Sequence, residues 1–362
     1  YKNNLHSLFP MIDDCINLGT IPFSILARHG FIAKTILNSL KNMNIFSIDE
    51  INHIQGCVET VASELVDDMS KLQKGMLKND VFMKKYGHLR PGTYDIMSNR
   101  YDQMSNFIKK GSDEDFIDHS KFSKFVPSKD QTKKIDKLLK ENNFKNFNTK
   151  KLLQYVNDAI IGREYGKFVF TKTLSNMLEL IGAFAEDNNL SRDEISHVPI
   201  DKLLRIEKNS LDFSIEDYLR EISKKESEKN EISCCIRLPQ LITDISGAYI
   251  VPFQVSHPNF ITNKKITAAS VVLHSNSEGV SVSLKNKIVV IEGADPGFDW
   301  IFSQKIAGLI TKYGGANSHM AIRCAEFGIP AAIGCGEQRF DMIVSGNKVH
   351  LDCAADLVMS VH

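Results

Sequence analysis

The spacing of the apolar residues changes near residue 240, and this change constrains the fold more than any other feature of the chain. Before it, apolar residues recur three and four positions apart, as on one face of an α-helix. After a capping box made by Ser47 and Glu50, one such run predicts a single long helix with a buried stripe. The stripe comprises Ile51, Ile54, Val58, Val61, Leu65, Met69 and Leu72. Residues 1–230 are therefore expected to be mostly helical.

Further helix signals support this expectation. Asn148 or Thr149 opens a long helical pattern that runs to about residue 187, and Ser191 with Glu194 makes a second capping box. The run SKKESEKNE at 223–231 is charged and nearly free of apolar groups. It is interpreted as the exposed end of a helix followed by a linker.

Beyond residue 240, short segments rich in β-branched residues alternate with turn signals. These segments lie at 247–253, 265–274, 287–292 and 307–311. Because helical pieces fall between some of them, they predict a compact α/β domain. The sequence thus predicts an α+β protein of more than one domain: a helical domain at 1–230, a linker or hinge at 231–264 and the α/β domain at 265–362.

Composition and charge exclude several function classes. Lysine plus arginine number 44 and aspartate plus glutamate number 44, so no net basic field would attract nucleic acid. No apolar run approaches the ~20 residues that a membrane-spanning helix needs. The seven cysteines are scattered and form no C-x-x-C pair, so neither a zinc site nor a secreted disulfide framework is indicated. We expect a cytoplasmic protein without a nucleic-acid partner, a membrane partner or metal ligands of its own.

The segment ITKYGGANSHMAIRCAEFGIPAAIG places one histidine where a glycine-rich loop becomes a helix. Gly314 and Gly315 let a ligand approach the main chain closely, and Asn317 and Ser318 are good N-cap residues. His319 is therefore expected in the first helical turn, where free N–H groups favour a bound anion. With its ordinary pKa near ~6.5 it would be mostly neutral and nucleophilic, which suits a carrier of phosphoryl groups. The alternative is a packed capping loop with an incidental histidine.

This segment resembles the phosphohistidine signature of the phosphoenolpyruvate-utilising enzymes, on Gly-Gly, Ser-His, Ala-Ile and Glu-Phe-Gly-Ile-Pro. The likeness continues upstream through KIVVIEGADPGFDWIFSQKIAGLIT and downstream to SGNKVHLDC, so it covers about residues 265–362. It implies a swivelling domain in which His319 carries a phosphoryl group between an ATP site and an acceptor site. Four residues would then hold the phosphoryl oxygens: Gly314, Gly315, Asn317 and Ser318.

One position departs from the family signature. The family's arginine before the glutamate is Ala325 here, and Arg323 stands two positions earlier. Residue 323 is one helical turn from His319, so Arg323 could face the phosphoryl group; the alternative is an exposed helix arginine. Asp299 and Trp300, in the segment DPGFDW, also resemble the family, but we interpret them as a structural cap and anchor.

A second resemblance lies at 84–102, KKYGHLRPGTYDIMSNRYD, which is similar to a stretch of the family's central domain. Its glycines and proline predict an irregular loop with polar side chains. They are His88, Arg90, Tyr94, Asp95 and Arg100. They could orient a zwitterionic acceptor or form a buried polar network between helices. Arg163 and Lys167 share a helix face, which suits an anion or a solvent-facing row of salt bridges.

The order of a helical region followed by a carrier domain is similar to that of rifampicin phosphotransferases and L-glutamine kinases, and the motifs look closer to the latter. The resemblance implies the C-terminal part of an ATP-dependent phosphotransferase that gives AMP and phosphate. The chain opens with Tyr1 and shows no glycine-rich phosphate loop, so ATP and Mg²⁺ are expected mainly on an N-terminal ATP-grasp domain of the same polypeptide.

The acceptor that the resemblance implies is the side-chain amide of L-glutamine, in the synthesis of capsule phosphoramidates. Two alternatives stay open. One is the same mechanism with another acceptor, such as a rifampicin-like antibiotic or pyruvate. The other is a catalytically inactive binding or regulatory module.

Overall fold

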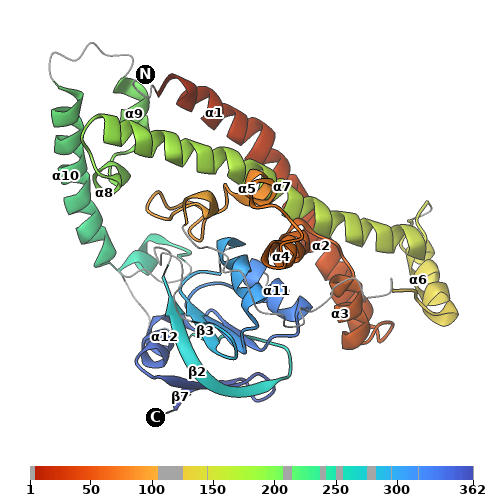
Figure 1. Cartoon of the computed structure of the whole chain (residues 1–362). Coiled ribbons are helices and arrows are strands. Elements are labelled where there is room, and N and C mark those ends of the chain that lie inside the picture. Colours follow the sequence, from red (N-terminus) through yellow and green to blue (C-terminus); the bar gives the residue numbers. More distant parts are fainter. Residues whose placement is uncertain are drawn as a thin grey trace.

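The computed structural model describes residues 5–104, 125–144, 146–206, 214–236, 242–249, 256–274, 283–294, 296–316 and 318–361. Helices make up the first part of the chain, and a mixed sheet with two helices makes up the last (Figure 1). This confirms the expected α+β fold, with a helical N-terminal region and a C-terminal sheet domain. Among the residues described, no helix combines the length and the apolar character needed to cross a membrane.

The helix α7 (Thr149–Asp187) is the longest element of the helical region and begins as predicted, with the Asn148 side chain accepting a hydrogen bond from Lys151 N at 2.9 Å. Helix α2 (Ile21–Asn42) packs along it (Figure 1). The remaining helices of this region are α1 (Leu8–Asp14), α3 (Ile48–Gly56), α4 (Val61–Gln73), α5 (Asn79–Tyr86), α6 (Lys129–Glu141), α8 (Arg192–Ser196), α9 (Ile200–Ile206) and α10 (Ile215–Cys234).

The prediction of one long helix through the stripe at 51–72 is wrong, because the helix is interrupted between the end of α3 and the start of α4. Thr60 opens α4 with its own capping box: its side chain accepts from Ser63 N, and Ser63 Oγ accepts from Thr60 N at 2.8 Å. The apolar spacing continues across this interruption. The apolar residues before it and after it pack into different hydrophobic clusters. Ile51 and Ile54 join one cluster with α2 and α7, whereas Leu65 and Met69 join another with α5.

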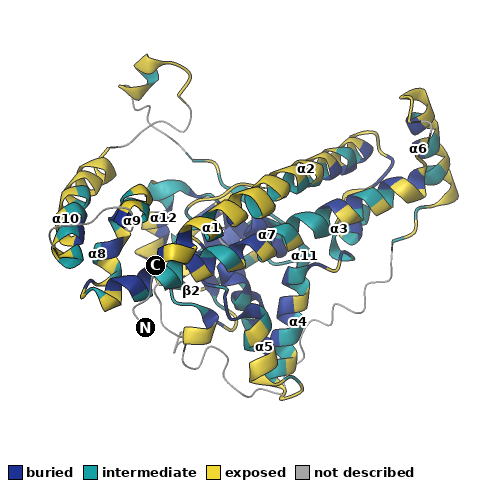
Figure 2. Ribbon diagram, turned by 90° about the horizontal axis from the view of Figure 1, so that it is seen from above, coloured by how far each residue is buried: buried dark blue, intermediate teal, exposed yellow. Residues whose placement is uncertain are grey.

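The charged run at 223–231 lies entirely within α10, which continues to Cys234. Only Leu219 and Ser223 of this helix are buried, so most of α10 faces solvent (Figure 2). The exposed helix end is thus confirmed, and the first four residues of the expected linker are still helical.

Within the described residues, the sheet of this domain has seven strands in the order β1-β5-β4-β3-β2-β6-β7. They are β1 (Asn259–Ile261), β2 (Lys265–Leu273), β3 (Ile288–Ile291), β4 (Gly308–Thr311), β5 (Ala331–Ile333), β6 (Lys348–Asp352) and β7 (Leu357–Val361). Strands β2 to β5 pair in parallel, and β1, β6 and β7 join antiparallel. All residues of β3 and β4 are buried, as expected where helices cover a parallel sheet.

Three predicted strands, at 265–274, 287–292 and 307–311, correspond to β2, β3 and β4. The fourth, at 247–253, is not a strand where it is described. Residues 247–249 belong to a short 3₁₀ turn and its end, and the other residues of that segment lie outside the described part of the chain.

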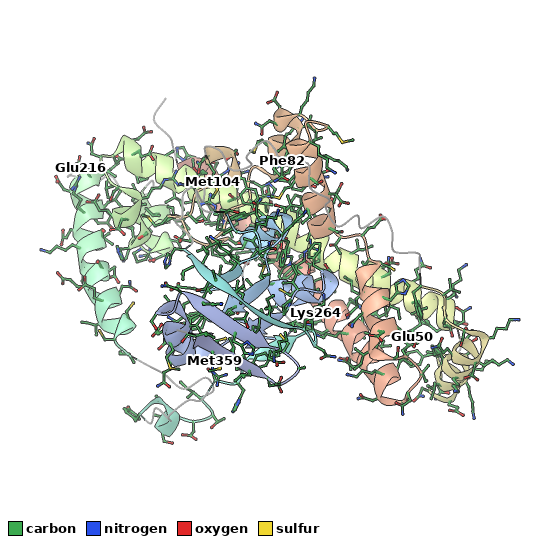
Figure 3. All side chains as sticks on the ribbon, turned by 60° about the horizontal axis from the view of Figure 1, so that its bottom comes forward. Glu50, Phe82, Met104, Glu216, Lys264 and Met359 are labelled. Carbon is green, nitrogen blue, oxygen red and sulfur yellow. The ribbon has the colours of Figure 1, made fainter. Side chains whose placement is uncertain are left out.

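The helical region and the sheet domain pack closely through α4, α3 and a 3₁₀ helix at Pro296–Gln304. Tyr101 Oη donates to Gly297 O at 2.6 Å, and a Cβ added at Gly297 would come within 1.8 Å of Arg90 O. Glycine is therefore required at this approach. In Figure 3 side chains fill the junction densely, whereas Met359 on β7 lies on the side of the sheet away from it.

Candidate functional site

The loop between β4 and helix α11 (His319–Glu326) places His319 at the carboxyl end of a parallel strand, where binding sites of open α/β sheets gather. Ser318 is the N-cap, and its Oγ accepts from Ala321 N at 3.4 Å. Gly314 has a φ of +127°, and a Cβ there would lie 2.9 Å from Ala294 Cβ. A Cβ at Gly315 would meet nothing within 4 Å, so that side of the loop is open. Asn317 lies outside the described residues.

Both ring nitrogens of His319 face carboxylates. Nε2 lies 2.7 and 2.8 Å from the two carboxylate oxygens of Asp299, in the 3₁₀ helix of the sheet domain. Nδ1 lies 3.1 Å from Glu164 Oε2, on α7 of the helical region. The residue is only 8% exposed. The histidine thus joins a carboxylate of its own domain to a carboxylate of the other.

These contacts correct the expectation that His319 is neutral. Burial by itself lowers the pKa of the imidazole, but Asp299 and Glu164 outweigh burial and raise it to about 9. Burial likewise raises the pKa of Glu164, and His319 together with Arg163 and Lys167 outweighs it and lowers that pKa to about 2. At neutral pH this arrangement holds an imidazolium between two carboxylates. It becomes a nucleophile only when one nitrogen loses its proton.

Asp299 and Glu164 were not identified as site residues from the sequence. The interpretation of Asp299 as a structural cap misses its contact with His319, and the sequence carries no signal for Glu164 between Arg163 and Lys167. They lie 20 and 155 residues from His319, so no helical or strand spacing connects them to it. The likeness of DPGFDW to the family was the one available signal for Asp299. Trp300 does pack between the two regions, as an anchor would.

Arg323 is buried, with 2% of its surface exposed, so the alternative of an exposed helix arginine is excluded. Its Nη2 donates to Ala62 O across the domain junction at 2.9 Å, and its guanidinium lies 4.5 Å from the centre of the Phe327 ring. Its Nε lies 3.8 Å from Asp299 Oδ1. Arg323 therefore faces the His319 site, as its spacing predicted, and it also ties the two regions together.

A cavity of about 280 Å³ opens on His319 between α2, α3, α7 and α11. Its polar lining includes Lys34, Asn52, Gln55, Arg163, Glu164 and Glu326. Arg163 thus lies at the site. This disfavours the alternative that it belongs to a solvent-facing row of salt bridges. Lys34 Nζ also donates to Ala316 O at 3.3 Å, and burial followed by the Arg163 charge lowers the pKa of Lys34. A second cavity, of about 50 Å³, touches His319 beside α4 and the loop at 87–100.

The structure does not gather the five polar residues of the 84–102 loop around one ligand. Every N–H of the Arg90 guanidinium has a protein acceptor, supplied by Ser175, Glu179 and the Asp95 and Ser98 carbonyls. This favours the alternative of a buried polar network for Arg90.

The other residues of that loop differ in where they lie. Arg100 makes two hydrogen bonds to Asp102, Tyr94 is 63% exposed, and an Asp95 carboxylate oxygen accepts from Met97 N. Besides Arg90, only His88 of the five lines the cavity that touches His319.

A magnesium site does not fit the residues at hand. Within the described ranges, no group of three or more His, Cys, Asp or Glu side chains is arranged to hold a metal ion.

Comparison with known families supports the resemblance of the carrier segment. Residues 284–356 match the family described as PEP-utilising enzyme, mobile domain. The matched segment contains Asp299, His319 and Arg323, and it implies a phosphotransferase with a phosphohistidine. It covers neither α7 nor the 84–102 loop, so it does not identify an acceptor. A search of curated proteins gives no match.

Proposed function

We propose that the protein is a phosphotransferase in which His319 carries a phosphoryl group to a small acceptor bound in the 280 Å³ cavity. One observation carries this proposal: His319 begins α11 inside the segment matched to the mobile domain, and it contacts Glu164 of the other region at the edge of that cavity. A histidine packed only for stability would not need two carboxylates and an adjoining cavity.

Asp299 and Glu164 have different roles in this scheme because they belong to different regions. Asp299 stays with His319 wherever the sheet domain moves, so it orients the ring and holds a proton on Nε2 when the ring is unmodified. Glu164 contacts Nδ1 only when the two regions are packed together. Loading the histidine requires that one of these contacts opens and that the freed nitrogen loses its proton.

The two half-reactions balance as follows. ATP, water and His319 give AMP, inorganic phosphate and phosphohistidine: the two phosphoanhydride bonds that hold the β-phosphoryl group break, a P–N bond forms from the deprotonated ring nitrogen to that group, and the water oxygen bonds the γ-phosphoryl group as its proton is released. The P–N bond then breaks, a bond from phosphorus to the acceptor forms, and the acceptor loses a proton. Glu164 is placed to take that proton, because its low pKa depends on a protonated His319 and rises once the ring carries a phosphoryl group. Backbone N–H groups at the start of α11 would hold the phosphoryl oxygens.

L-glutamine is the acceptor that we propose, and ATP on an ATP-grasp domain of the same polypeptide is the donor. Lys34 and Arg163 in the cavity suit a carboxylate, and the side-chain oxygens of Asn52 and Gln55 suit an ammonium. The volume of about 280 Å³ is slightly below the ~300–1,000 Å³ typical of pockets for drug-sized ligands, which favours a small acceptor over a macrocyclic antibiotic.

Phosphorus NMR of the full-length gene product with ATP, Mg²⁺ and L-glutamine tests both levels of the proposal. AMP, phosphate and a new phosphoramidate resonance should form, and His319→Ala should abolish all three while His197→Ala, outside both cavities, should not. AMP formation that depends on His319 without a new resonance would keep the carrier and discard L-glutamine. The absence of His319-dependent turnover with any acceptor would favour a binding module.

A further inference from the structure

The guanidinium of Arg323 has one buried N–H group that makes no hydrogen bond. Nη1 donates to Glu326 Oε2 and Nη2 donates to Ala62 O, whereas Nε has no hydrogen-bond partner within the described residues. Buried N–H groups of charged side chains are rarely left without an acceptor, because nothing then offsets their lost hydration. Asp299 Oδ1 lies 3.8 Å from Nε, about 1 Å beyond the usual hydrogen-bond distance.

The Asp299 carboxylate could supply the missing acceptor. It is 3% exposed, and within the described residues its ion pairs are with His319 and Arg323. Its two oxygens lie 2.7 and 2.8 Å from Nε2 of His319, so the imidazolium neutralises it at present. When the ring loses the proton on Nε2, the buried carboxylate loses its counterion. That loss is costly unless a second cation takes the place of the first.

The side chains of His319, Asp299 and Arg323 all belong to the sheet domain and stay together when that domain moves. Two of their other contacts do not, because Ala62 O lies on α4 and Glu164 lies on α7. Separation of the two regions therefore releases Nη2 of the guanidinium and Nδ1 of the ring. The Phe327 ring, whose centre is 4.5 Å from the guanidinium, is part of the sheet domain and keeps the guanidinium beside the carboxylate.

The other charged groups around the His319 ring lie, except for Glu326, on the helical region. They are Glu164, Arg163 and Lys167 on α7 and Lys34 on α2. These groups remain behind when the sheet domain separates. Glu326 is on α11, but burial raises its pKa, and it is already paired with Nη1 of Arg323. Among these described groups, Arg323 is thus the cation that moves with Asp299.

We propose that Asp299 exchanges His319 for Arg323 as its partner when the two regions separate, and that this exchange makes His319 a nucleophile. The proposal rests on the phosphotransferase function above and adds Arg323 as a positioning residue for the loading step. In the packed state, Ala62 O holds the guanidinium away from Asp299, and the ring stays charged. In the separated state, Nε and Nη2 bind the two carboxylate oxygens, and the Nε2 proton leaves to water. The P–N bond to the β-phosphoryl group of ATP then forms at Nε2.

The test follows the loading of the full-length protein by ATP labelled in its β-phosphoryl group, without acceptor, between pH 6 and pH 10. Arg323→Met fills a similar space without a charge or an N–H. It should lower the loading rate at pH 7 by about tenfold to a hundredfold, since each unit by which the His319 pKa rises removes about tenfold of the neutral ring. The rate should recover near pH 10, where the ring is neutral without help. Arg339→Met, on α12 and outside both cavities, should leave the pH profile unchanged.

Two further readouts keep the outcomes distinct. In ¹⁵N NMR the Nε–H signal of Arg323 should move downfield on loading, and coupling to phosphorus should place the phosphoryl group on Nε2 of His319. If the wild type is never labelled, the proposed function fails first. If it is labelled and Arg323→Met has the same pH profile as Arg339→Met, the exchange is wrong and the carrier stands.

Two other results would also overturn the exchange. One is a loss in Arg323→Met that does not recover at high pH and comes with a lowered unfolding temperature, which would assign Arg323 a packing role. The other is a phosphoryl group on Nδ1, because Asp299 could then keep its contact with Nε2 throughout the cycle.

Discussion

His319 and His88 are both buried, yet their surroundings drive their charges in opposite directions. Two carboxylates raise the pKa of His319 to about 9, whereas burial and two cationic side chains lower that of His88 to about 4. Burial lowers both pKa values, so the two carboxylates set the direction for His319, whereas for His88 burial is the largest cause and the two cations add to it. The fold places two carboxylates against the His319 ring, whereas the charges that act on the His88 ring are those of Lys172 and Arg100. The following changes test that contrast, from the largest expected effect to the smallest.

Replacing His319 with alanine removes the histidine whose pKa is raised. Acid-labile phosphorylation should disappear and turnover should fall by at least about 10³-fold, because the variant lacks the imidazole proposed to carry the phosphoryl group. Labelling with radioactive ATP followed by acid and alkali treatment measures this directly. Labelling that survives in the variant contradicts the carrier role, provided that the unfolding temperature is unchanged.

Asp299→Asn should lower the pKa of His319 from about 9 toward its ordinary 6.5, because the contacts at 2.7 and 2.8 Å lose their charge. An amide also disturbs the ring orientation, so we expect turnover to fall by about 10²–10⁴-fold. NMR titration of the His319 ring measures the pKa. An unchanged value would show that Glu164 alone keeps the ring charged. Asp356→Asn, on an exposed loop between β6 and β7, is the matched control.

Glu164→Gln should change how stability depends on pH. The raised pKa of His319 stabilises the packed regions fully below pH 6.5, and this stabilisation is lost as the pH rises toward 9. The lowered pKa of Glu164 contributes above pH 4.5 and is lost as the pH falls toward 2. In the variant the free energy of unfolding should vary less with pH in both the alkaline and the acid range. At neutral pH it should fall by up to about 3–5 kcal/mol. Unfolding midpoints between pH 3 and 10 check this, and superimposable curves would contradict it.

Lys172→Gln should raise the pKa of His88 by a small amount only. Burial is the larger cause of the shift, and Arg100 remains, so the ring should stay neutral at pH 7. Titration of the His88 ring by NMR measures the change. A His88 that titrates near 6.5 in this variant would mean that charge rather than burial keeps it neutral, and the two histidines would then differ only in the sign of their neighbours.

Local signals in the sequence predicted much of the fold. The start of α7 at Asn148, the strands β2 to β4 and the position of His319 all follow from caps, glycines and β-branched runs that act over a few residues. The break between α3 and α4 was missed because a Thr-Ser capping box is a weak pattern. The apolar spacing continues through that break and conceals it.

The site was harder to predict than the fold. The spacing of Arg323 placed it correctly on the face toward His319, since one helical turn is a local relation. Asp299 and Glu164 meet His319 only through tertiary packing, and no periodicity reports such contacts. Arg90 shows the opposite failure. Its loop has the composition of a binding site, but the number of acceptors around a buried guanidinium depends on where α7 lies.

In the proposed scheme, the contact between Nδ1 of His319 and Glu164 would give the movement of the carrier a direction. An unloaded, protonated ring attracts Glu164, but a loaded ring carries a dianion and repels it. His319 and Glu164 would therefore repel each other before the phosphoryl group is transferred to the acceptor and attract each other afterwards. The cations of the large cavity, Lys34 and Arg163, must then offset this repulsion on arrival. A carrier of this kind needs no separate residue to detect the phosphoryl group. The phosphoryl group itself changes the electrostatic interaction between His319 and Glu164 from attraction to repulsion.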